Sequence, residues 1–225
     1  MLLIVTDVND SVQKIISLLR NHTKQYPPPL SDFVVAEFGP DPFLILVACL
    51  LSLRAKDSMT IHVVRDLFAT VRTPEQLCAC ALPTLERLIK RIGFYKTKAR
   101  TLKAVACIIV HEFGGKVPRM YEQLISIKGV GPKTANLVLG VAFGVPAICV
   151  DVHVHRICNR FGLIKTKTPE QTEAALQKLL DKKYWTEWNS LVVTWGQQVC
   201  TPVSPRCSTC ALANLCKRVG VMRAR

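Results

Sequence analysis

Apolar and polar residues follow the three-to-four-residue spacing of amphipathic helices along the chain, and no run of alternating strands is visible. A first helix is predicted from Asp10 to His22. The longest apolar run, FLILVACLLSL (Phe43 to Leu53), is about half the length that a bilayer-spanning helix needs, so it predicts a buried core helix. The pattern therefore predicts an all-α protein with about ten helices.

Residues that begin helices recur at regular points. The string Thr-Pro-Glu-Gln occurs at 73–76 and again at 168–171. In each copy the threonine can cap a helix, the proline suits its first position and the glutamine can complete a capping box. Asp57 is predicted to cap a further helix.

Glycine and proline mark the ends of elements. Gly114 and Gly115 are predicted to end a long helix that begins near Lys96. The stretch YPPPLSDFVVAEFGPDP, from Tyr26 to Pro42, is rich in proline and predicts a connection between two lobes.

The composition narrows the class of protein. The chain has 225 residues, 49% of them apolar, which is enough for one domain or two small lobes. Its net charge of +14 indicates a polyanionic partner, with nucleic acid first, although a merely soluble basic protein stays open. The start, MLLIVTDVND, lacks the basic region of a secretion signal, so we expect a cytoplasmic protein, nucleoid-associated if prokaryotic. We also expect a monomer.

The ten cysteines fall into two groups. Six lie in apolar helical context and are predicted to be small buried side chains in a reducing compartment: Cys49, Cys78, Cys80, Cys107, Cys149 and Cys158. Four cluster near the end with C-x6-C-x2-C-x5-C spacing: Cys200, Cys207, Cys210 and Cys216. Four thiolates this close suit tetrahedral zinc or an iron–sulfur cube, and spacing alone leaves both open.

A glycine turn precedes the most informative helix. Gly129-Val130-Gly131 joins two apolar helical stretches, and Pro132 suits the first position of the second one. The unpaired N–H groups at such a helix start bind phosphate well, although a plain tight turn is the alternative. Lys133 follows, and taken alone it is a solvated surface ion.

The distance along the chain allows Lys133 to meet Asp151. A helix over 132–143 is about 18 Å long, and the seven residues 144–150 can span up to about 23 Å. The chain can therefore fold back on itself. Asp151 also precedes a helical run and, taken alone, is predicted to cap it.

Two strings, IKGVGPKTAN and VDVHVHRICNR, resemble the helix-hairpin-helix DNA glycosylases, specifically the endonuclease III family. The resemblance runs from about Pro42 to Cys216. It implies two helical lobes: a six-helix barrel with the hairpin over 35–145, and a lobe of 1–34 and 146–225 that holds an iron–sulfur cluster.

The resemblance implies an enzyme that excises oxidised pyrimidines from duplex DNA and then cleaves the strand by β-elimination. Lys133 would displace the base and form a Schiff base, and Asp151 would stabilise positive charge on the sugar. Only about 0.1% of an ordinary lysine is neutral at pH 7.5, so a closed pocket must lower the pKa of this amine. A close carboxylate opposes that, so we expect the two residues to flank the sugar without pairing.

The resemblance also implies the cofactor and several DNA contacts. Cys200, Cys207, Cys210 and Cys216 would hold a [4Fe–4S] cluster, and Lys217 beside them would meet phosphates. The amides of Gly129, Val130 and Gly131 would bind the lesion strand. His153 would contact a phosphate or the pocket wall, although a structural histidine is the plainer interpretation.

The flipped nucleotide leaves a gap in the duplex that an apolar wedge fills. The string RIGFYKTKAR resembles the family loop that carries this wedge, which implies Phe94, or secondarily Ile92, as the wedge residue. A core residue is the alternative for Phe94. Lys96, Lys98 and Arg100 are predicted to form a row of phosphate contacts. Arg54 stands where the family commonly carries glutamine, which puts the preferred lesion and opposite base in doubt.

Two other functions stay open. One is a related glycosylase acting on mispaired adenine, thymine or uracil. The adenine-specific relatives usually lack the lysine and carry a further C-terminal domain. The other is a non-catalytic helix-hairpin-helix DNA-binding protein, with zinc-finger-like binding as a weaker variant.

Overall fold

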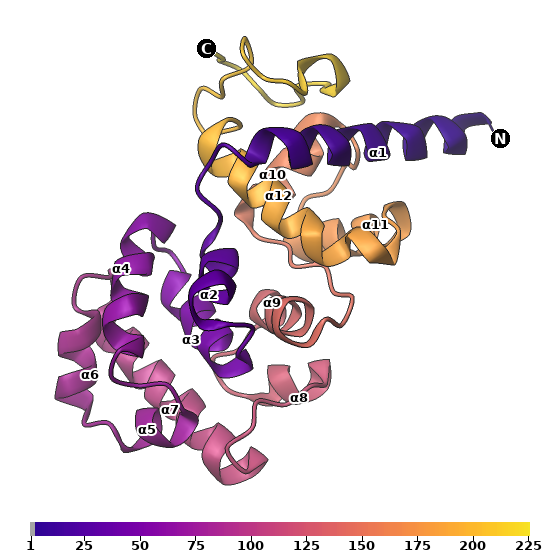
Figure 1. The fold of residues 1–225 in the computed structure, drawn as a ribbon. Coiled ribbons are helices and arrows are strands. Elements are labelled where there is room, and N and C mark those ends of the chain that lie inside the picture. Colours follow the sequence, from indigo (N-terminus) through magenta and orange to yellow (C-terminus); the bar gives the residue numbers. More distant parts are fainter. Residues whose placement is uncertain (1–2) are drawn as a thin grey trace. The chain divides into compact units, whose positions relative to one another are not determined.

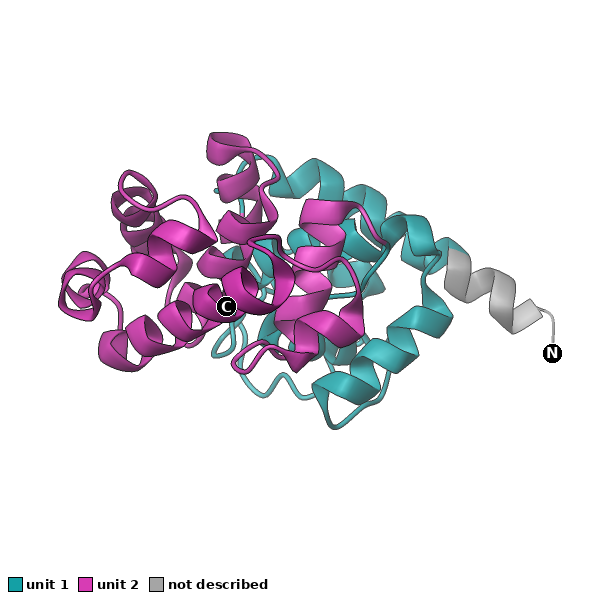
Figure 2. Cartoon of the chain, turned by 90° about the horizontal axis from the view of Figure 1, so that it is seen from below, with its two compact units in different colours: residues 1–28, 146–225 teal, residues 29–145 magenta. Residues whose placement is uncertain are grey.

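The computed structural model describes the backbone of residues 3–225 and the side chains from Asp10 onward. Every regular element of this part of the chain is helical, as predicted. The chain divides into two compact units, residues 29–145 and residues 1–28 with 146–225 (Figure 2). The predicted boundaries between the lobes in the sequence are 34/35 and 145/146. The observed boundaries between the compact units are 28/29 and 145/146, so the second coincides with the prediction and the first lies six residues earlier than predicted.

The unit of residues 29–145 is built from eight α-helices (Figure 1). They are α2 (Leu30–Phe38), α3 (Pro42–Ser52), α4 (Asp57–Phe68), α5 (Pro74–Ala79), α6 (Leu82–Ile89), α7 (Tyr95–Phe113), α8 (Tyr121–Ser126) and α9 (Pro132–Phe143).

The helix α3 is the centre of this unit. All residues from Phe43 to Leu51 are buried, which confirms the predicted core helix. A helix that is apolar on every side must be surrounded, and α3 packs against α2, α4, α7 and α9. Asp41 starts it by accepting hydrogen bonds from the N–H groups of Phe43 and Leu44 at 2.8 and 2.9 Å.

Most predicted helix boundaries are confirmed. Thr73 and Gln76 form the full capping box of α5. At the second copy Thr168 accepts from the Gln171 N–H, and the Gln171 side chain instead reaches the N–H of Lys167. Gly114 ends α7 in the left-handed conformation.

Two predictions for the start of this unit need correction. The Pro-rich stretch does contain the boundary between the two units, at 28/29, but more than half of it forms α2, in which Leu30 and Val34 are buried. Asp57 does not cap α4, whose N-cap residue is Lys56. The Asp57 carboxylate instead accepts the Leu30 N–H at 3.1 Å, so it satisfies a donor in the first turn of α2.

The other unit, residues 1–28 with 146–225, is arranged around α12. Its helices are α1 (Leu3–Thr23), α10 (Val152–Phe161), α11 (Pro169–Leu179) and α12 (Trp185–Gln198). Both α1 and α10 pack along α12 (Figure 1). Leu19, Ile157 and Trp188 belong to the resulting core.

The cysteine predictions hold in part. Cys49, Cys149 and Cys158 are buried, and burial raises the pKa of the Cys158 thiol to about 12, so it stays neutral. The prediction is wrong for Cys78 and Cys107, which form a disulfide between α5 and α7. The two helices pack along each other, which brings these half-buried side chains together although 29 residues separate them in sequence.

Within the described part of the chain, no helix combines the length and apolar character required to cross a bilayer.

The disulfide predicts a measurable contribution to stability. Closing a loop of this length stabilises a protein by about 3.5 kcal/mol, mainly by restricting the unfolded chain. A Cys78→Ser/Cys107→Ser double variant should therefore have a lower midpoint of urea unfolding. Cys80→Ser is the matched control, because Cys80 is a free thiol two residues from Cys78. Equal midpoints for the double variant and the control would show that the disulfide contributes nothing.

Candidate functional site

The turn between α8 and α9 has the geometry of a compact hairpin. Gly129 has a φ of +104°, which L side chains rarely adopt. A Cβ atom there would also lie 2.9 Å from Cγ2 of Thr101 in α7. Only glycine fits both constraints, so Gly129 fixes the turn against α7.

Val130 and Gly131 have different roles in the turn. The Val130 side chain is buried and its N–H donates to the Ile127 carbonyl at 2.9 Å. The Val130 amide therefore has a partner within the turn, and a phosphate contact of Val130 stays a prediction. Gly131 has open space where a Cβ would stand, so the start of α9 is accessible at this residue.

Lys133 lies in the first turn of α9 and is half-buried. Its neighbour Thr134 is buried, and the Cys49 Sγ donates to the Thr134 hydroxyl at 3.5 Å. Because Cys49 belongs to α3, the central helix directly fixes the turn that carries Lys133.

Asp151 caps α10, as its position predicts. A single carboxylate oxygen, Oδ1, accepts the N–H groups of His153 and Val154 at 2.9 Å each. The segment before it is held from α12, where the buried Asn189 donates to the Cys149 carbonyl at 2.9 Å. Lys133 and Asp151 belong to different compact units, so their placement on either side of a sugar stays a prediction.

His153 packs within its own unit. The Arg156 guanidinium donates to its Nδ1 at 3.1 Å. A Cβ on Gly196 would lie 2.6 Å from the same nitrogen, so the ring rests directly on α12. This contact agrees with the structural interpretation, and a DNA contact of His153 stays a prediction.

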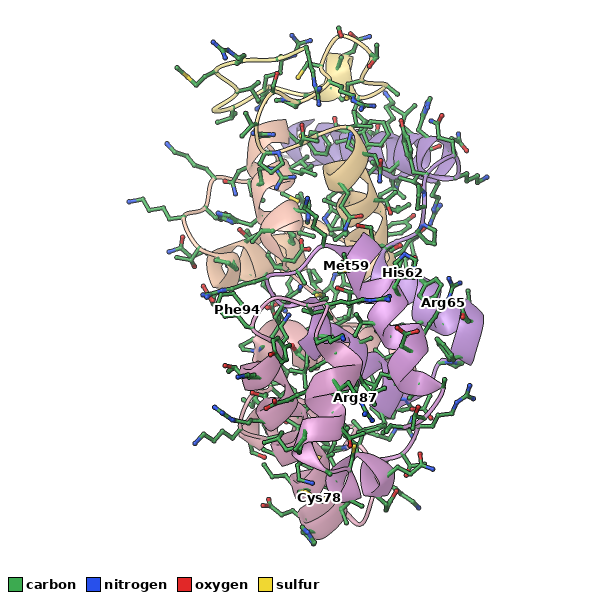
Figure 3. All side chains as sticks on the ribbon, turned by 90° about the vertical axis from the view of Figure 1, so that its left-hand side faces the viewer. Met59, His62, Arg65, Cys78, Arg87 and Phe94 are labelled. Carbon is green, nitrogen blue, oxygen red and sulfur yellow. A yellow bond between two sulfur atoms is a disulfide. The ribbon has the colours of Figure 1, made fainter. Side chains whose placement is uncertain are left out.

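Two loops of the unit 29–145 present a residue with left-handed backbone. Arg54 follows α3, is exposed and has a φ of +56°. Phe94 precedes α7 with a φ of +60°, and 68% of its surface is exposed (Figure 3). Phe94 is therefore not a core residue. Ile92 is only 2% exposed, so its prediction as a wedge is wrong: it belongs to the core.

The four C-terminal cysteines share one small cavity of about 20 Å³. It lies wholly within the unit of residues 1–28 and 146–225. All four line its wall: Cys200, Cys207, Cys210 and Cys216. In the described residues, no three His, Cys, Asp or Glu side chains are grouped closely enough to hold a single metal ion.

Hydrogen-bond donors and cations surround these sulfurs. The Arg160 guanidinium donates to Sγ of Cys200 at 3.5 Å, and the Arg218 N–H donates to Sγ of Cys216 at 3.4 Å. Burial, and then the other cysteines, raise the pKa of the Cys216 thiol. Four thiolates would repel one another here, so the donor set fits a positively charged inorganic group that all four sulfurs share.

The chain end folds back over the cysteine loop. The Arg225 N–H donates to the Pro205 carbonyl at 2.9 Å, and the Ser208 N–H donates to the Arg225 carbonyl at 3.1 Å. Val221 lines the cavity. Lys217 is exposed, and the stem of its side chain packs over Gly162 at the end of α10.

Sequence reasoning missed three side chains that hold these parts together. Arg156 donates to the carbonyls of Gly196 and Cys200 at 3.1 and 2.8 Å, and Arg160 donates to that of Thr201 at 2.7 Å. Their spacing of four residues places them on one face of α10, which was the available signal. The third is Asn189, for which the sequence carries no such signal.

Comparison with known proteins agrees with this arrangement. The sequence model of the HhH-GPD superfamily of base excision DNA repair proteins matches residues 47–182. Endonuclease III of Thermotoga maritima is 44% identical over 79% of this chain and 83% of its own length. Endonuclease III of Bacillus subtilis is 38% identical over 79% and 81%.

Solved structures show the same fold. The structure of a non-covalent endonuclease III–DNA complex superposes with a TM-score of 0.83 at 31% identity, covering 93% of this chain and 95% of that one. A trapped endonuclease III–DNA covalent intermediate gives a TM-score of 0.77 at 33% identity, covering 92% and 95%. The chain therefore belongs to the endonuclease III family, within the HhH-GPD superfamily of base excision DNA repair glycosylases.

Proposed function

We propose that this glycosylase and abasic-site lyase removes oxidised pyrimidines from duplex DNA, with Lys133 as the nucleophile. The observation that carries the proposal is the position of Lys133 in the first turn of α9, directly after the glycine hairpin. The similar endonuclease III structures are a DNA complex and a covalent DNA intermediate, which supports duplex DNA as the partner. The net charge of +14 agrees with such a polyanion.

In the proposed reaction the neutral Lys133 amine attacks C1′ of the flipped nucleotide. The N-glycosidic bond breaks, its electron pair leaves with the base, and the base takes up a proton. The lysine nitrogen then gives up one proton, and a proton is delivered to the ring oxygen O4′. The C1′–O4′ bond breaks, its electron pair stays on O4′, and the nitrogen lone pair forms the protonated Schiff base with C1′. Loss of a C2′ proton expels the 3′ phosphate, which is β-elimination. The Asp151 carboxylate stabilises the positive charge that develops on the sugar and assists proton transfer.

The hairpin and the two exposed loops of the same unit would engage the duplex. The accessible start of α9 at Gly131 suits a phosphate of the lesion strand. Phe94 is exposed and apolar, which suits a wedge that fills the gap in the base stack. Arg54 would contact the opposite strand, and Lys217 a phosphate near the cysteine loop.

We also propose that the four cysteines hold a [4Fe–4S] cluster. Four sulfurs around one small cavity, with hydrogen-bond donors to two of them, support this proposal. When bound, it would supply a covalent crosslink that pins the loop of residues 200–216 in place. The residues of the loop would then orient the exposed cations that follow it.

A mismatch glycosylase is the second candidate, and one observation favours it. Arg54 is exposed in a loop of the unit that carries Lys133. Arginine makes strong bidentate contacts with guanine. Arg54 would therefore select guanine as the opposite base more strictly than the glutamine that the family commonly carries at this position. Assays with each of the four bases opposite an oxidised pyrimidine, and with unmodified mismatches, separate the two candidates.

Lys133→Gln should abolish borohydride trapping on abasic duplex DNA, because an amide cannot form a Schiff base. Lys128→Gln, which changes an exposed lysine one residue before the hairpin, is the control and should still trap DNA. Trapping of Lys133→Gln at the wild-type level would remove Lys133 from this role.

The capping role of Asp151 can be tested separately from the role of its charge. Asp151→Asn keeps a capping oxygen, so stability should change by only a few tenths of a kcal/mol, while excision falls by about a hundredfold or more through loss of the charge. Asp151→Ala should lose excision and also about 1 kcal/mol of stability. Full excision activity in the asparagine variant would mean that the residue is only a cap.

Metal analysis tests the cysteine site. The purified protein should carry about four irons per chain and show broad visible absorption. Cys207→Ser should lose both, whereas Cys80→Ser, outside the cavity, should keep them. If the protein instead carries one zinc per chain and shows no visible absorption, the proposal of an iron–sulfur cluster is wrong and the site binds zinc.

A further inference from the structure

Lys98 is the one member of the predicted phosphate row that turns into its own unit. Lys96 and Arg100 are exposed on α7, whereas Lys98 between them is half-buried. Its Nζ donates to the Leu51 carbonyl at 2.7 Å. The prediction that Lys98 contacts a phosphate is therefore wrong, because its ammonium group is bonded to the end of α3.

The bond satisfies a carbonyl that the helix leaves without a partner. Leu51 lies in the last turn of α3, where main-chain carbonyls have no partner within the helix and the dipole is negative. Ser52 Oγ donates to the Cys49 carbonyl and the Ala55 N–H to that of Ser52. The Lys98 ammonium thus completes the C-terminal cap of α3.

The Lys98 side chain connects the start of α7 to the end of α3. Lys98 lies in the first turn of α7, where its backbone N–H makes the ordinary helical bond to the Phe94 carbonyl at 3.0 Å. Its side chain reaches Leu51, three residues before Arg54. The side-chain bond therefore ties the helix turn that follows Phe94 to the helix end that precedes Arg54.

Both loops need such support. Arg54 and Phe94 have φ values of +56° and +60°, which non-glycine residues keep only where neighbouring structure holds them. Burial lowers the pKa of Lys98, so placing the ammonium here is unfavourable without its carbonyl partner. The interaction is local, because Leu51, Phe94 and Lys98 all belong to one compact unit.

We propose that Lys98 is a positioning residue that locks the Arg54 and Phe94 loops to each other, so that both enter the duplex as one rigid element. The proposal rests on the proposed function, in which these two residues contact the opposite strand and the gap in the stack. Without the bond from Lys98 to Leu51, both loops would have to become ordered when they enter the duplex. The cost of this ordering would make base flipping less favourable and would reduce the discrimination between opposite bases.

The test compares Lys98→Met with Lys103→Met. Lys103 is a matched control on the same helix, because its Nζ donates to the carbonyls of Cys78 and Cys80, away from either loop. Both variants should lose thermal stability, and the loss for Lys103→Met should be at least as large as the loss for Lys98→Met. Only Lys98→Met should slow single-turnover excision, by about tenfold, and reduce the differences in rate among the four opposite bases.

Lys98→Arg should restore most of the rate, because a guanidinium can donate to the same carbonyl. Two results would overturn the proposal. The first is equal activity of the two methionine variants. The second is a loss of activity in Lys98→Met that is the same for all opposite bases, together with a salt dependence of DNA binding that is weaker by about one phosphate contact. Failure of the proposed function is recognised separately, because the wild-type protein would then neither excise an oxidised pyrimidine nor form a trapped complex.

Discussion

The burial of α3 is the constraint on which the unit of residues 29–145 depends. Nine consecutive buried residues, Phe43–Leu51, require neighbours on every side, and α2, α4, α7 and α9 supply them. Two of these neighbours begin with residues of functional interest, Phe94 before α7 and Lys133 in α9. The core thus determines where these residues lie, and polar contacts of Cys49 and Leu51 with α9 and α7 fix the final geometry.

The residues of the proposed function lie at helix ends. Lys133 lies in a first turn, Asp151 is an N-cap, and Arg54 follows a last turn. Helix ends carry the main-chain groups that need partners, and they are also where the chain can reach DNA. Asp151 therefore has two roles in the proposed function. One of its carboxylate oxygens caps α10, and the same carboxylate supplies the negative charge that the proposed reaction needs.

Much of this could be read from the sequence, and the failures have physical causes. Periodicity and caps predicted α3, α5, α7 and α9, because those signals are local. The disulfide of Cys78 with Cys107, the bond of Asp57 to Leu30 and the inward turn of Lys98 were missed. Each depends on which helices pack together, and a single sequence does not state that. The prediction of Ile92 as a wedge failed similarly, since a position in a loop does not reveal whether the side chain is exposed.

The central claim is that the turn fixed by α3 presents the amine that attacks the sugar. The most direct test is to trap the wild-type protein on abasic duplex DNA with borohydride, digest the complex and map the modified peptide by mass spectrometry. The account predicts a single reduced adduct on Lys133. An adduct on another lysine or on the terminal amine, with Lys133 unmodified, would contradict it.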